Sequence, residues 1–389
     1  MAENLIYFTL KNKYSLNIAV NTRLLLPNRL EGIGWFTYES FSRIVKQHPE
    51  HTFYFLFDRP FDEKFVFADN VVPIVLRPPA RHPILFVIWF EWSVKQFLRK
   101  HCIDLFVSPD GYLSLGSDVP SLAVIHDLNF EHHPKDLPWT PRKYYSFFFP
   151  KFAKKARRIA TVSEYSKHDI AATYQINPSK IDVVYNGVNP DFKPIPVEEQ
   201  DAVRASYTGA HPYFLYVGAL HPRKNIKRLL LAFDQVASAH QNIHLLLVGE
   251  AMWSDKDLKN TYRQLSNSDR VKFTGRLSSV RLQQVFASAF ALCYVPYFEG
   301  FGIPIIEAMK SGIPVMAANK TSLPEVSGDA ALLVDPFDLS DIARGMTELL
   351  SDQKLCQSLR KKGMERAQRF TWENTASLLW ESMMKTLTT

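Results

Sequence analysis

Two glutamates flank a glycine turn in the segment YFEGFGIPIIEAMKSGIPV, residues 297–315. Glu299 comes directly before the turn Gly300–Gly302, and seven residues separate it from Glu307. A glycine turn that opens a helix exposes backbone N–H groups, and the helix dipole there favours anions such as phosphate. Carboxylates on either side accept hydrogen bonds from hydroxyl groups. These residue types therefore predict a site for a ligand with both hydroxyl and phosphate groups, such as a nucleotide sugar.

A strand before this turn and a helix after it would position the two glutamates. The run LCYVPY, residues 292–297, is short, apolar and aromatic, which is typical of a buried parallel strand. Pro304 favours a helix start, because proline is tolerated in the first helical turn. We then expect Glu299 at the strand end and Glu307 one turn into the helix. Such turns also occur in α/β proteins without a ligand, so the segment needs support from elsewhere.

A pair of adjacent cations gives that support. Arg223 and Lys224 lie in YVGALHPRKN, after an apolar strand-like run and just before a helical pattern. Fixed cations at a helix N-terminus neutralise a diphosphate and the charge that develops as it leaves. We expect the pair across a cleft from the glycine turn. The alternative is ordinary salt bridging at the surface.

Three further positions carry weaker signals. Gly34 lies in LEGIGWFTYES, where the third glycine of a dinucleotide fingerprint is missing, so close backbone approach to a ligand fits better than an NAD site. Gly275, in FTGRLSSVRL, permits a similar approach beside a nucleotide base. His126 ends the run SLAVIHD. It either orients a hydroxyl group or is a structural histidine bonded to backbone.

The composition bounds the class of protein. The chain has 389 residues, too many for one typical core and enough for two domains. With 46% hydrophobic and 22% charged residues, it is typical of soluble globular proteins. Its 3 cysteines are far apart, which indicates a reducing compartment without structural disulfides. The nearby pair His132 and His133 matches no established ligand spacing, so we expect neither a metal nor a cofactor.

The apolar runs are too short for a membrane span. The first apolar strand, residues 16–20, is too short for the core of a signal peptide, and residues 1–15 are expected to be an extension before it. The run ILFVIWF, residues 84–90, is also far below the length that crosses a bilayer. We therefore expect a cytoplasmic protein without an integral membrane segment.

The net charge of +7 is concentrated in residues 135–158, which contain 8 Lys or Arg residues and the single acid Asp136. Aromatic residues such as Trp139 lie among these cations. This combination predicts peripheral contact with an anionic membrane at its inner face. The alternative is an amphipathic helix with an aromatic core face and a solvated basic face. No nucleic-acid-binding module accompanies the segment, so nucleic acid is not an expected partner.

Apolar strand-like runs alternate with helical patterns along almost the whole chain, which predicts a parallel α/β architecture. A break with linker composition lies at residues 189–200. We predict an N-terminal domain over residues 1–190, a C-terminal domain over 201–370, and a final helix, 371–389, that crosses back to the N-terminal domain. Ligands of such folds bind outside the carboxyl ends of the strands, here in the cleft between the domains.

We predict strands in twelve runs: LNIAVNT, HTFYFLF, DLFVSP, SLAVIHD, RIATVS, IDVVYNG, PYFLYVG, IHLLLVGE, RVKFTG, AFALCYVP, IPVMAA and AALLVDP.

An ordered series of segments resembles the retaining glycosyltransferases of family four. In chain order these are GIGWFTYE, VIHDLNFEHHP, RIATVSEYSKHDI, VVYNGV, YVGALHPRKN, FTGRL, YFEGFGIPIIEAMKSGIPV and SLPEVSGDAALLVDP. The resemblance covers roughly residues 16–380, nearly the whole chain. The resemblance implies the GT-B fold, in which two Rossmann-like domains face each other across an interdomain cleft. It also implies that the N-terminal domain binds an acceptor and the C-terminal domain a nucleotide-sugar donor.

The resemblance also implies roles for residues near the paired glutamates. Glu299 is similar to the acid that faces the transferred sugar, and Glu307 to the carboxylate that binds the donor ribose. The amides of Phe301 and Gly302 would hold the sugar and the phosphate. Gly300 belongs to the same turn.

The remaining roles fall on residues outside that segment. Arg223 and Lys224 match the cations that bind the diphosphate. His126 matches a histidine near the sugar and the acceptor, and Gly34 a glycine loop near the phosphate. Many relatives have an arginine directly after the glycine of the strand at YVG, whereas this chain has Ala219. We expect Arg223 to supply that charge.

The implied reaction is a front-face substitution with retention at the anomeric carbon, in which protein cations and helix dipoles stabilise the leaving group instead of a metal. We expect mannosyl transfer from GDP-mannose to a hydroxyl of a glycan or lipid-linked acceptor in cell-surface polysaccharide synthesis. One alternative is a UDP-sugar-dependent glucosyl or N-acetylglucosaminyl transferase. Others are a nucleotide-sugar epimerase and a scaffold without catalytic activity.

Overall fold

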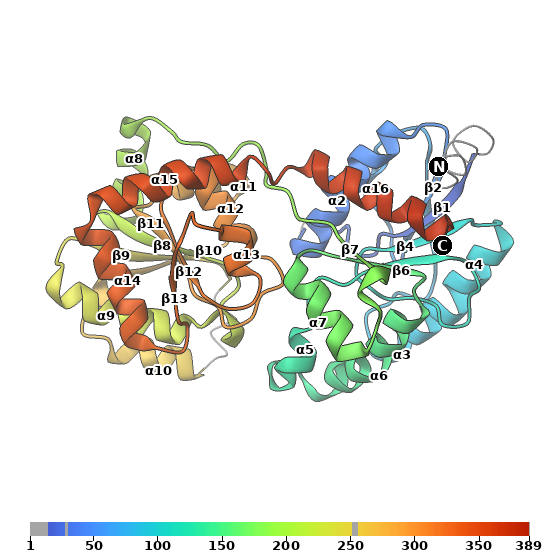
Figure 1. Ribbon diagram of the computed structural model, residues 1–389, viewed down its shortest axis with the longest axis horizontal. Helices are drawn as coiled ribbons and strands as arrows, with labels where there is room; N and C mark the ends of the chain where they lie inside the picture. The colour runs from blue at the N-terminus through green and yellow to red at the C-terminus, as the bar shows by residue number, and fades with distance from the viewer. Residues whose placement is uncertain (1–14, 28–29, 251–255, 389) are drawn as a thin grey trace. The chain divides into compact units, whose positions relative to one another are not determined.

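The computed structural model describes residues 15–27, 30–250 and 256–388, and these residues form two compact units (Figure 1). Unit 1 contains the described residues up to Val162, then Lys167–Val184 and the chain from Trp372 onward. Unit 2 contains Ser163–Ser166 and Tyr185–Thr371. The predicted extension, residues 1–15, lies outside the described residues except for residue 15.

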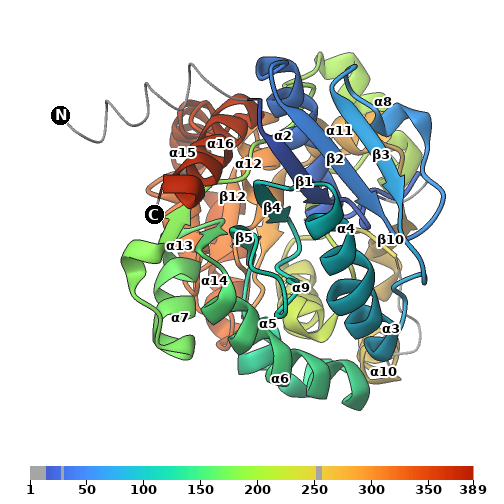
Figure 2. The same ribbon diagram turned by 90° about the vertical axis from the view of Figure 1, so that its right-hand side faces the viewer.

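Unit 1 is built on a parallel sheet of seven strands in the order β3-β2-β1-β4-β5-β6-β7 (Figure 2). The order along the sheet reverses between β1 and β4, which pair directly. The strands are β1 (Asn17–Asn21), β2 (Thr52–Phe57), β3 (Val71–Val75), β4 (Leu105–Ser108), β5 (Ser121–Val124), β6 (Arg158–Thr161) and β7 (Ile181–Val183).

Helices cover both faces of this sheet and enclose two apolar clusters. The last helix of the chain, α16, lies along α2 and contributes Trp372, Leu379 and Met383 to one cluster (Figure 1). The helices are α2 (Gly32–Gln47), α3 (Pro83–Ile88), α4 (Lys95–Lys100), α5 (Asn129–His132), α6 (Trp139–Lys155), α7 (Glu164–Tyr174) and α16 (Trp372–Thr388); a π-helical segment, Trp89–Val94, joins α3 to α4.

Unit 2 has a parallel sheet of six strands in the order β10-β9-β8-β11-β12-β13, which reverses between β8 and β11. The strands are β8 (Tyr213–Val217), β9 (His244–Val248), β10 (Val271–Gly275), β11 (Ala291–Tyr294), β12 (Val315–Ala318) and β13 (Leu332–Val334). The helices are α8 (Val197–Thr208), α9 (Ile226–Ala239), α10 (Lys256–Gln264), α11 (Ser279–Ser288), α12 (Ile303–Lys310), α13 (Leu323–Ser327), α14 (Leu339–Ser351) and α15 (Gln353–Ala367).

The structure confirms the parallel α/β architecture, and each of the twelve predicted runs contains a strand. The prediction missed β3, whose sequence VVPIV has a proline at its centre. Proline cannot donate to a strand ladder, so it argues against a central strand. Because β3 is at the edge of the sheet, Pro73 is tolerated there.

Candidate active site

The loops after β8 and β11 hold the candidate residues of unit 2. These strands are neighbours, with Phe214 opposite Ala291, so the loops at their carboxyl ends emerge side by side. The loop after β8 forms a short 3₁₀ turn, Pro222–Lys224, directly before α9. The loop after β11 carries Glu299. Ligands of doubly wound sheets bind at such a reversal of strand order.

The Glu299 carboxylate holds these loops together. Its Oε1 atom accepts hydrogen bonds from Arg223 Nη1 at 2.8 Å, from the Tyr294 hydroxyl at 3.1 Å and from Lys224 Nζ. Lys224 Nζ also donates to the Tyr294 hydroxyl at 2.7 Å. The expectation that the cations lie across a cleft from the glycine turn is wrong. They contact the glutamate that precedes the turn, because β8 and β11 are adjacent.

Burial and charge set the protonation of this cluster, in which Glu299 and Lys224 are only 8% and 9% exposed. Burial raises the pKa of Glu299, but the charges of Arg223 and Lys224 outweigh it and leave the pKa below its ordinary value. Burial, followed by the charge of Glu299, raises the pKa of Tyr294 well above its ordinary value. The glutamate is therefore ionised and the tyrosine neutral. Two cations against one carboxylate leave the cluster with net positive charge.

Hydrogen bonds to its carbonyl groups fix the glycine turn. The hydroxyls of Ser163 and Ser166 donate to the Gly300 carbonyl at 2.8 and 3.3 Å, and Ser322 Oγ donates to the Glu299 carbonyl at 2.9 Å. Gly302 has φ of 95° and a Cβ there would lie 2.5 Å from a Leu323 side-chain carbon, so this position requires glycine. Gly302 directly precedes α12, so the first amides of that helix begin at the turn.

Glu307 lies on α12 and is partly buried. Burial raises the pKa of this carboxyl group to about 8. Within the described part of the chain, its side chain makes no hydrogen bond. We expected two carboxylate acceptors around the turn. At neutral pH Glu307 is instead mainly protonated, so it can both donate and accept.

The two weaker glycine candidates have different surroundings. Gly275 ends β10 with φ of 70°, and a Cβ there would meet nothing within 4 Å, so its surface is open to a ligand. Gly34 is buried in α2, where a Cβ would lie 2.9 Å from the Leu24 carbonyl oxygen. The close approach predicted at Gly34 therefore includes the chain's own backbone.

His126 belongs to unit 1. Its Nε2 atom lies 2.9 Å from the Pro109 carbonyl oxygen, and its ring packs edge-on against Phe36 at 5.0 Å. Burial lowers the pKa of His126, which favours the neutral ring at pH 7. His126 therefore makes the backbone contact that was expected of a structural histidine. The structure brings Glu299, Arg223 and Lys224 together in unit 2, whereas His126 and Gly34 lie in unit 1.

Glu325 was not among the predicted site residues, although it orders the segments that begin at Ser163 and Tyr185. Its carboxylate accepts hydrogen bonds from the amides of Glu164 and Tyr165 at 2.8 and 2.9 Å, and from the Tyr185 hydroxyl at 2.9 Å. All four residues belong to unit 2. A carboxylate at the first turn of a helix, here α7, supplies acceptors for amides without partners in the helix.

Sequence reasoning also missed a polar network in unit 1, built from Asn21, Arg23 and Asp110. The sheet order reverses between β1 and β4. Asn21 ends β1, Arg23 follows that strand, and Asp110 follows β4. Their position at the ends of apolar runs was visible in the sequence. The adjacency of the two strands was not.

Two known families match the chain. Glycosyltransferase Family 4 matches residues 31–192, and Glycosyl transferases group 1 matches residues 199–366. The O-antigen chain mannosyltransferase B of Escherichia coli is 31% identical over 260 residues, which are 65% of this chain and 67% of that protein. The chain is a family 4 glycosyltransferase.

Other relatives of this family 4 glycosyltransferase agree. The O-antigen chain mannosyltransferase RfbU of Salmonella typhimurium is 27% identical over 292 residues, 70% of this chain and 72% of that protein. The structure of Anabaena Alr3699/HepE in complex with UDP and glucose superposes with a TM-score of 0.73 at 18% identity, covering 95% of this chain and 100% of that one. These comparisons confirm the resemblance and the GT-B fold.

Proposed function

We propose that this glycosyltransferase transfers mannose from GDP-mannose to a hydroxyl of a glycan or lipid-linked acceptor in cell-surface polysaccharide synthesis, with retention at the anomeric carbon. The observation that carries the proposal is the positively charged cluster of Arg223, Lys224 and Glu299 beside a glycine turn at a helix start. The similarity to O-antigen mannosyltransferases supports mannose as the sugar.

The donor diphosphate would bind to this cluster. Arg223 and Lys224 supply the positive charge, and the amides of Phe301 and Gly302, with Gly300 in the same turn, lie at the start of α12. Positive charge and backbone N–H groups favour the same anion. Because Glu299 fixes both cations, they need little rearrangement as charge develops on the leaving diphosphate. In the proposal these groups do the work of a metal ion.

The nucleoside would bind beside the diphosphate. Glu307 has no hydrogen-bond partner among the described residues and is mainly protonated at neutral pH, so it can donate to and accept from ribose hydroxyls. The open surface at Gly275 suits the flat face of a base. Both residues belong to unit 2, which is proposed to hold the donor.

In the proposed reaction the acceptor oxygen forms a bond to the anomeric carbon on the face from which the diphosphate departs. The bond from that carbon to the phosphate oxygen breaks with its electron pair, and the acceptor proton passes to the same phosphate oxygen. Glu299 stays ionised and contributes charge without forming a covalent bond. His126, neutral at pH 7, is proposed to orient a hydroxyl of the sugar or acceptor in unit 1.

Thermal unfolding with a panel of nucleotides tests the donor assignment. A ligand that binds only the folded state stabilises it by about 2.7 kcal/mol at a hundred times its Kd. We expect GDP and GDP-mannose to raise Tm more than UDP, ADP, UDP-glucose or UDP-N-acetylglucosamine. A selective response to uridine nucleotides would replace mannose by glucose or N-acetylglucosamine. Conversion of the donor sugar without any acceptor would favour an epimerase, and no response at all would reject the donor site.

We also propose that unit 1 contacts an anionic membrane surface at its inner face, as a peripheral protein. The described residues contain no helix that is both long and apolar enough to cross a bilayer. Most of the segment 135–158 forms α6, which buries Tyr144, Phe149 and Phe152, as the amphipathic alternative predicts. It nevertheless leaves Trp139 and Phe147 71% and 56% exposed.

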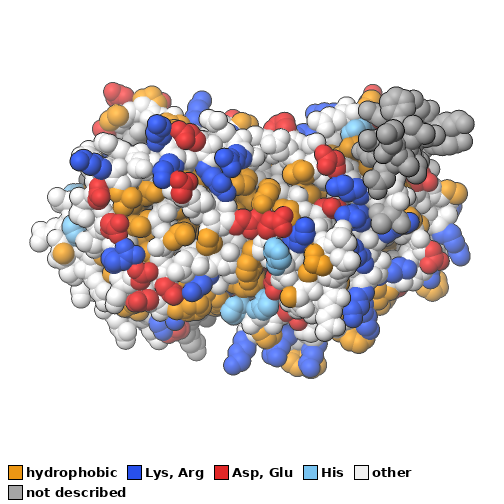
Figure 3. All heavy atoms as spheres, viewed as in Figure 1, with side chains coloured by type: hydrophobic (Ala, Val, Ile, Leu, Met, Phe, Trp, Pro, Cys, Tyr) orange, Lys and Arg blue, Asp and Glu red, His pale blue; other side chains and the backbone are white. Residues whose placement is uncertain are grey.

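The neighbouring helix α3 extends this exposed surface. Ile84, Ile88 and, in the π-helical segment that follows, Trp92 are spaced four residues apart and are 66%, 43% and 73% exposed. Phe86 of α3 packs against Tyr144 of α6 at 5.6 Å, so the two helices lie side by side (Figure 2). Lys, Arg and hydrophobic side chains gather over α5 and α6 (Figure 3). Apolar anchors among cations suit an anionic lipid surface.

A further inference from the structure

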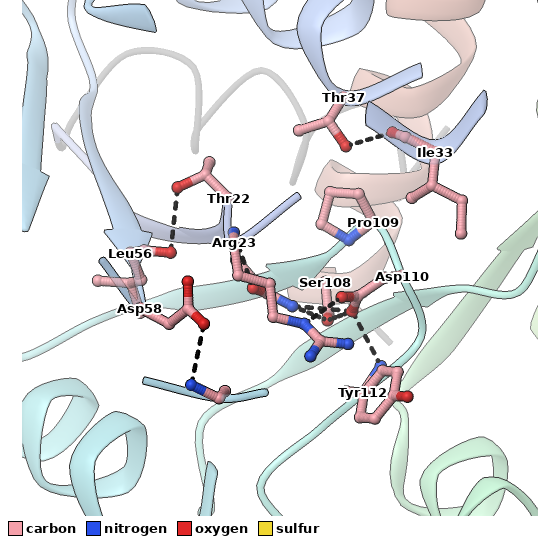
Figure 4. Close-up of polar contacts among 12 residues, drawn as sticks. Thr22, Arg23, Ile33, Thr37, Leu56, Asp58, Ser108, Pro109, Asp110 and Tyr112 are labelled. Atoms are coloured by element: carbon pink, nitrogen blue, oxygen red, sulfur yellow. Dashed lines mark hydrogen bonds and ion pairs between the residues drawn. The ribbon is translucent and has the colours of Figure 1, made fainter. Parts of the chain in front are cut away.

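A buried polar network in unit 1 has no part in the function proposed above. It lies where β1 and β4 end, at the reversal of strand order in the sheet (Figure 4). Asp110 Oδ1 accepts hydrogen bonds from Asn21 Nδ2 at 2.8 Å, Ser108 Oγ at 3.0 Å and the Tyr112 amide at 3.3 Å. Three donors therefore fix the carboxylate, which leaves Oδ2 to face Arg23.

Arg23 is held in one orientation. Its Nε atom donates to Asp110 Oδ2 at 2.6 Å, and its guanidinium carbon lies 4.2 Å from the centre of the Tyr112 ring and 4.8 Å from that of Phe86. The side chain is only 7% exposed. Burial lowers the pKa of Arg23, but the charge of Asp110 outweighs it, so the pKa is raised and the group stays charged.

The two terminal nitrogens of Arg23, Nη1 and Nη2, do not share the hydrogen bond that Nε makes to Asp110. A guanidinium has five N–H donors, and Asp110 accepts from Nε alone. The Tyr112 hydroxyl also interacts with the guanidinium and, like Asp110, raises its pKa. The Asp58 carboxylate lies near Arg23 (Figure 4). It is bound instead by the Ala80 amide and by Arg59. Among the described residues, neither Nη atom therefore meets a carboxylate.

If the Arg23–Asp110 ion pair only joined the loops after β1 and β4, the terminal nitrogens of Arg23 would not need to be kept away from carboxylates. A single Nε bond uses one edge of the guanidinium, whereas the edge with two parallel N–H groups is the one that matches a carboxylate or phosphate. Here aromatic rings and Asp110 hold the arginine so that its terminal nitrogens meet no carboxylate within residues 15–27, 30–250 and 256–388. A cation fixed in this way at the switch point of a doubly wound sheet is placed for a ligand.

We propose that the terminal nitrogens of Arg23 bind an oxyanion, a phosphate or a carboxylate, on the acceptor substrate, and that Asp110 is the positioning residue. The acceptor is then an acidic glycan or a phosphate-bearing carrier, and a neutral glycan is a poor substrate. The inference rests on the proposed function in that it assigns the acceptor to unit 1. It does not depend on which nucleotide sugar is the donor.

The test measures binding of methyl phosphate and of acetate to the full chain by calorimetry, at constant ionic strength. Each titration is made with and without saturating GDP, so that phosphate binding in unit 2 is recognised by its loss with GDP. We expect GDP-independent binding of one of the two anions. Arg23→Met should weaken it at least tenfold and Arg23→Lys, which keeps the charge but not the parallel N–H groups, by less. The anion that binds identifies phosphate or carboxylate as the acceptor group.

Arg59→Met is the matched control, because Arg59 is also bound by an aspartate, Asp58, at the end of a neighbouring strand of the same sheet. It should leave anion binding unchanged. Equal anion binding by Arg23→Met and by the unaltered chain would overturn the proposal. The proposal would also fail if neither methyl phosphate nor acetate bound in the presence of saturating GDP. If Arg23→Met does not fold, Arg23→Lys and Asp110→Asn decide, and unchanged affinity in both would also overturn it. Failure of GDP to bind would count against the proposed donor alone.

Discussion

The ammonium group of Lys224 contacts the carboxylate of Glu299, although 75 positions separate the two residues in the chain. The Tyr294 hydroxyl completes a triangle with them, accepting from the ammonium and donating to the carboxylate. Lys224, which is proposed to bind the donor diphosphate, is therefore oriented before any ligand arrives. A preformed charged site needs little reorganisation during reaction, which is how such groups stabilise a leaving diphosphate.

Lys224→Ala tests this arrangement. Removing the ammonium leaves Glu299 paired with Arg223 and abolishes the excess positive charge, so we expect the Kd for GDP-mannose to rise at least tenfold, about 1.4 kcal/mol. Calorimetric titration measures it. Lys227→Ala is the control, because Lys227 pairs with Asp257 at the exposed surface. Equal affinity in the Lys224 variant and in its control would remove Lys224 from the donor site.

Glu299→Gln separates charge from shape. The amide keeps the size of the side chain but leaves two cations without their carboxylate, so we expect a loss of stability of about 1–3 kcal/mol. The depressed pKa of Glu299 means that its contribution is present above the unfolded pKa and is lost as the pH falls through the folded one. Denaturant unfolding at pH 7 and at pH 3 measures both effects. A difference between variant and parent that does not shrink at pH 3 would contradict this.

Glu307 predicts the opposite pH dependence. Its pKa of about 8 lies above the ordinary 4.5, so the folded state binds the proton more tightly than the unfolded state. Stability from this group should therefore fall as pH rises from 4.5 to 8, by on the order of 2–5 kcal/mol in total. Glu307→Gln should flatten the stability profile over this range. Identical slopes for variant and parent would show that burial does not govern this carboxyl group.

Gly302→Ala tests the glycine turn. Both the φ of 95° and the contact of 2.5 Å to Leu323 oppose a side chain, so we expect a loss of more than about 2 kcal/mol and weaker donor binding. Gly209→Ala is the matched control. Its φ is also positive, at 62°, but a Cβ would meet nothing closer than 4.0 Å, so it should cost about 1 kcal/mol and leave donor binding intact. Equal losses in the two variants would mean that Leu323 moves aside easily.

If unit 1 contacts the membrane, changes to its exposed aromatic residues should weaken vesicle binding without affecting donor binding in unit 2. Replacing Trp92, Trp139 and Phe147 together by serine should reduce co-sedimentation with vesicles that contain phosphatidylglycerol, while donor binding persists. Binding by the parent should also weaken with salt and on neutral vesicles. Val280→Ser, in α11 of unit 2, is the control because Val280 is 66% exposed. Unchanged sedimentation of the triple variant would reject the surface.

Local sequence predicted most of the fold because buried parallel strands are short apolar runs between helical patterns. It failed at Pro73, where strand position within the sheet decides whether proline is tolerated. The sequence also singled out Glu299, Arg223 and Lys224, but not their mutual contact, which depends on β8 and β11 being neighbours. Arg23 and Asp110 were missed for the same reason, because each is an ordinary polar residue until β1 and β4 pair. The protonation of Glu307 required its burial to be known.

The return of α16 to unit 1 has a consequence for the order in which the protein matures on the ribosome. Apart from the short segment Ser163–Ser166, unit 2 is one uninterrupted stretch of chain, whereas one core cluster of unit 1 includes side chains from α16. Since α16 is translated after unit 2, unit 2 can complete its fold while unit 1 still exposes the apolar surface that α16 covers. Most of unit 1 is therefore synthesised before unit 2 but completes its fold after it.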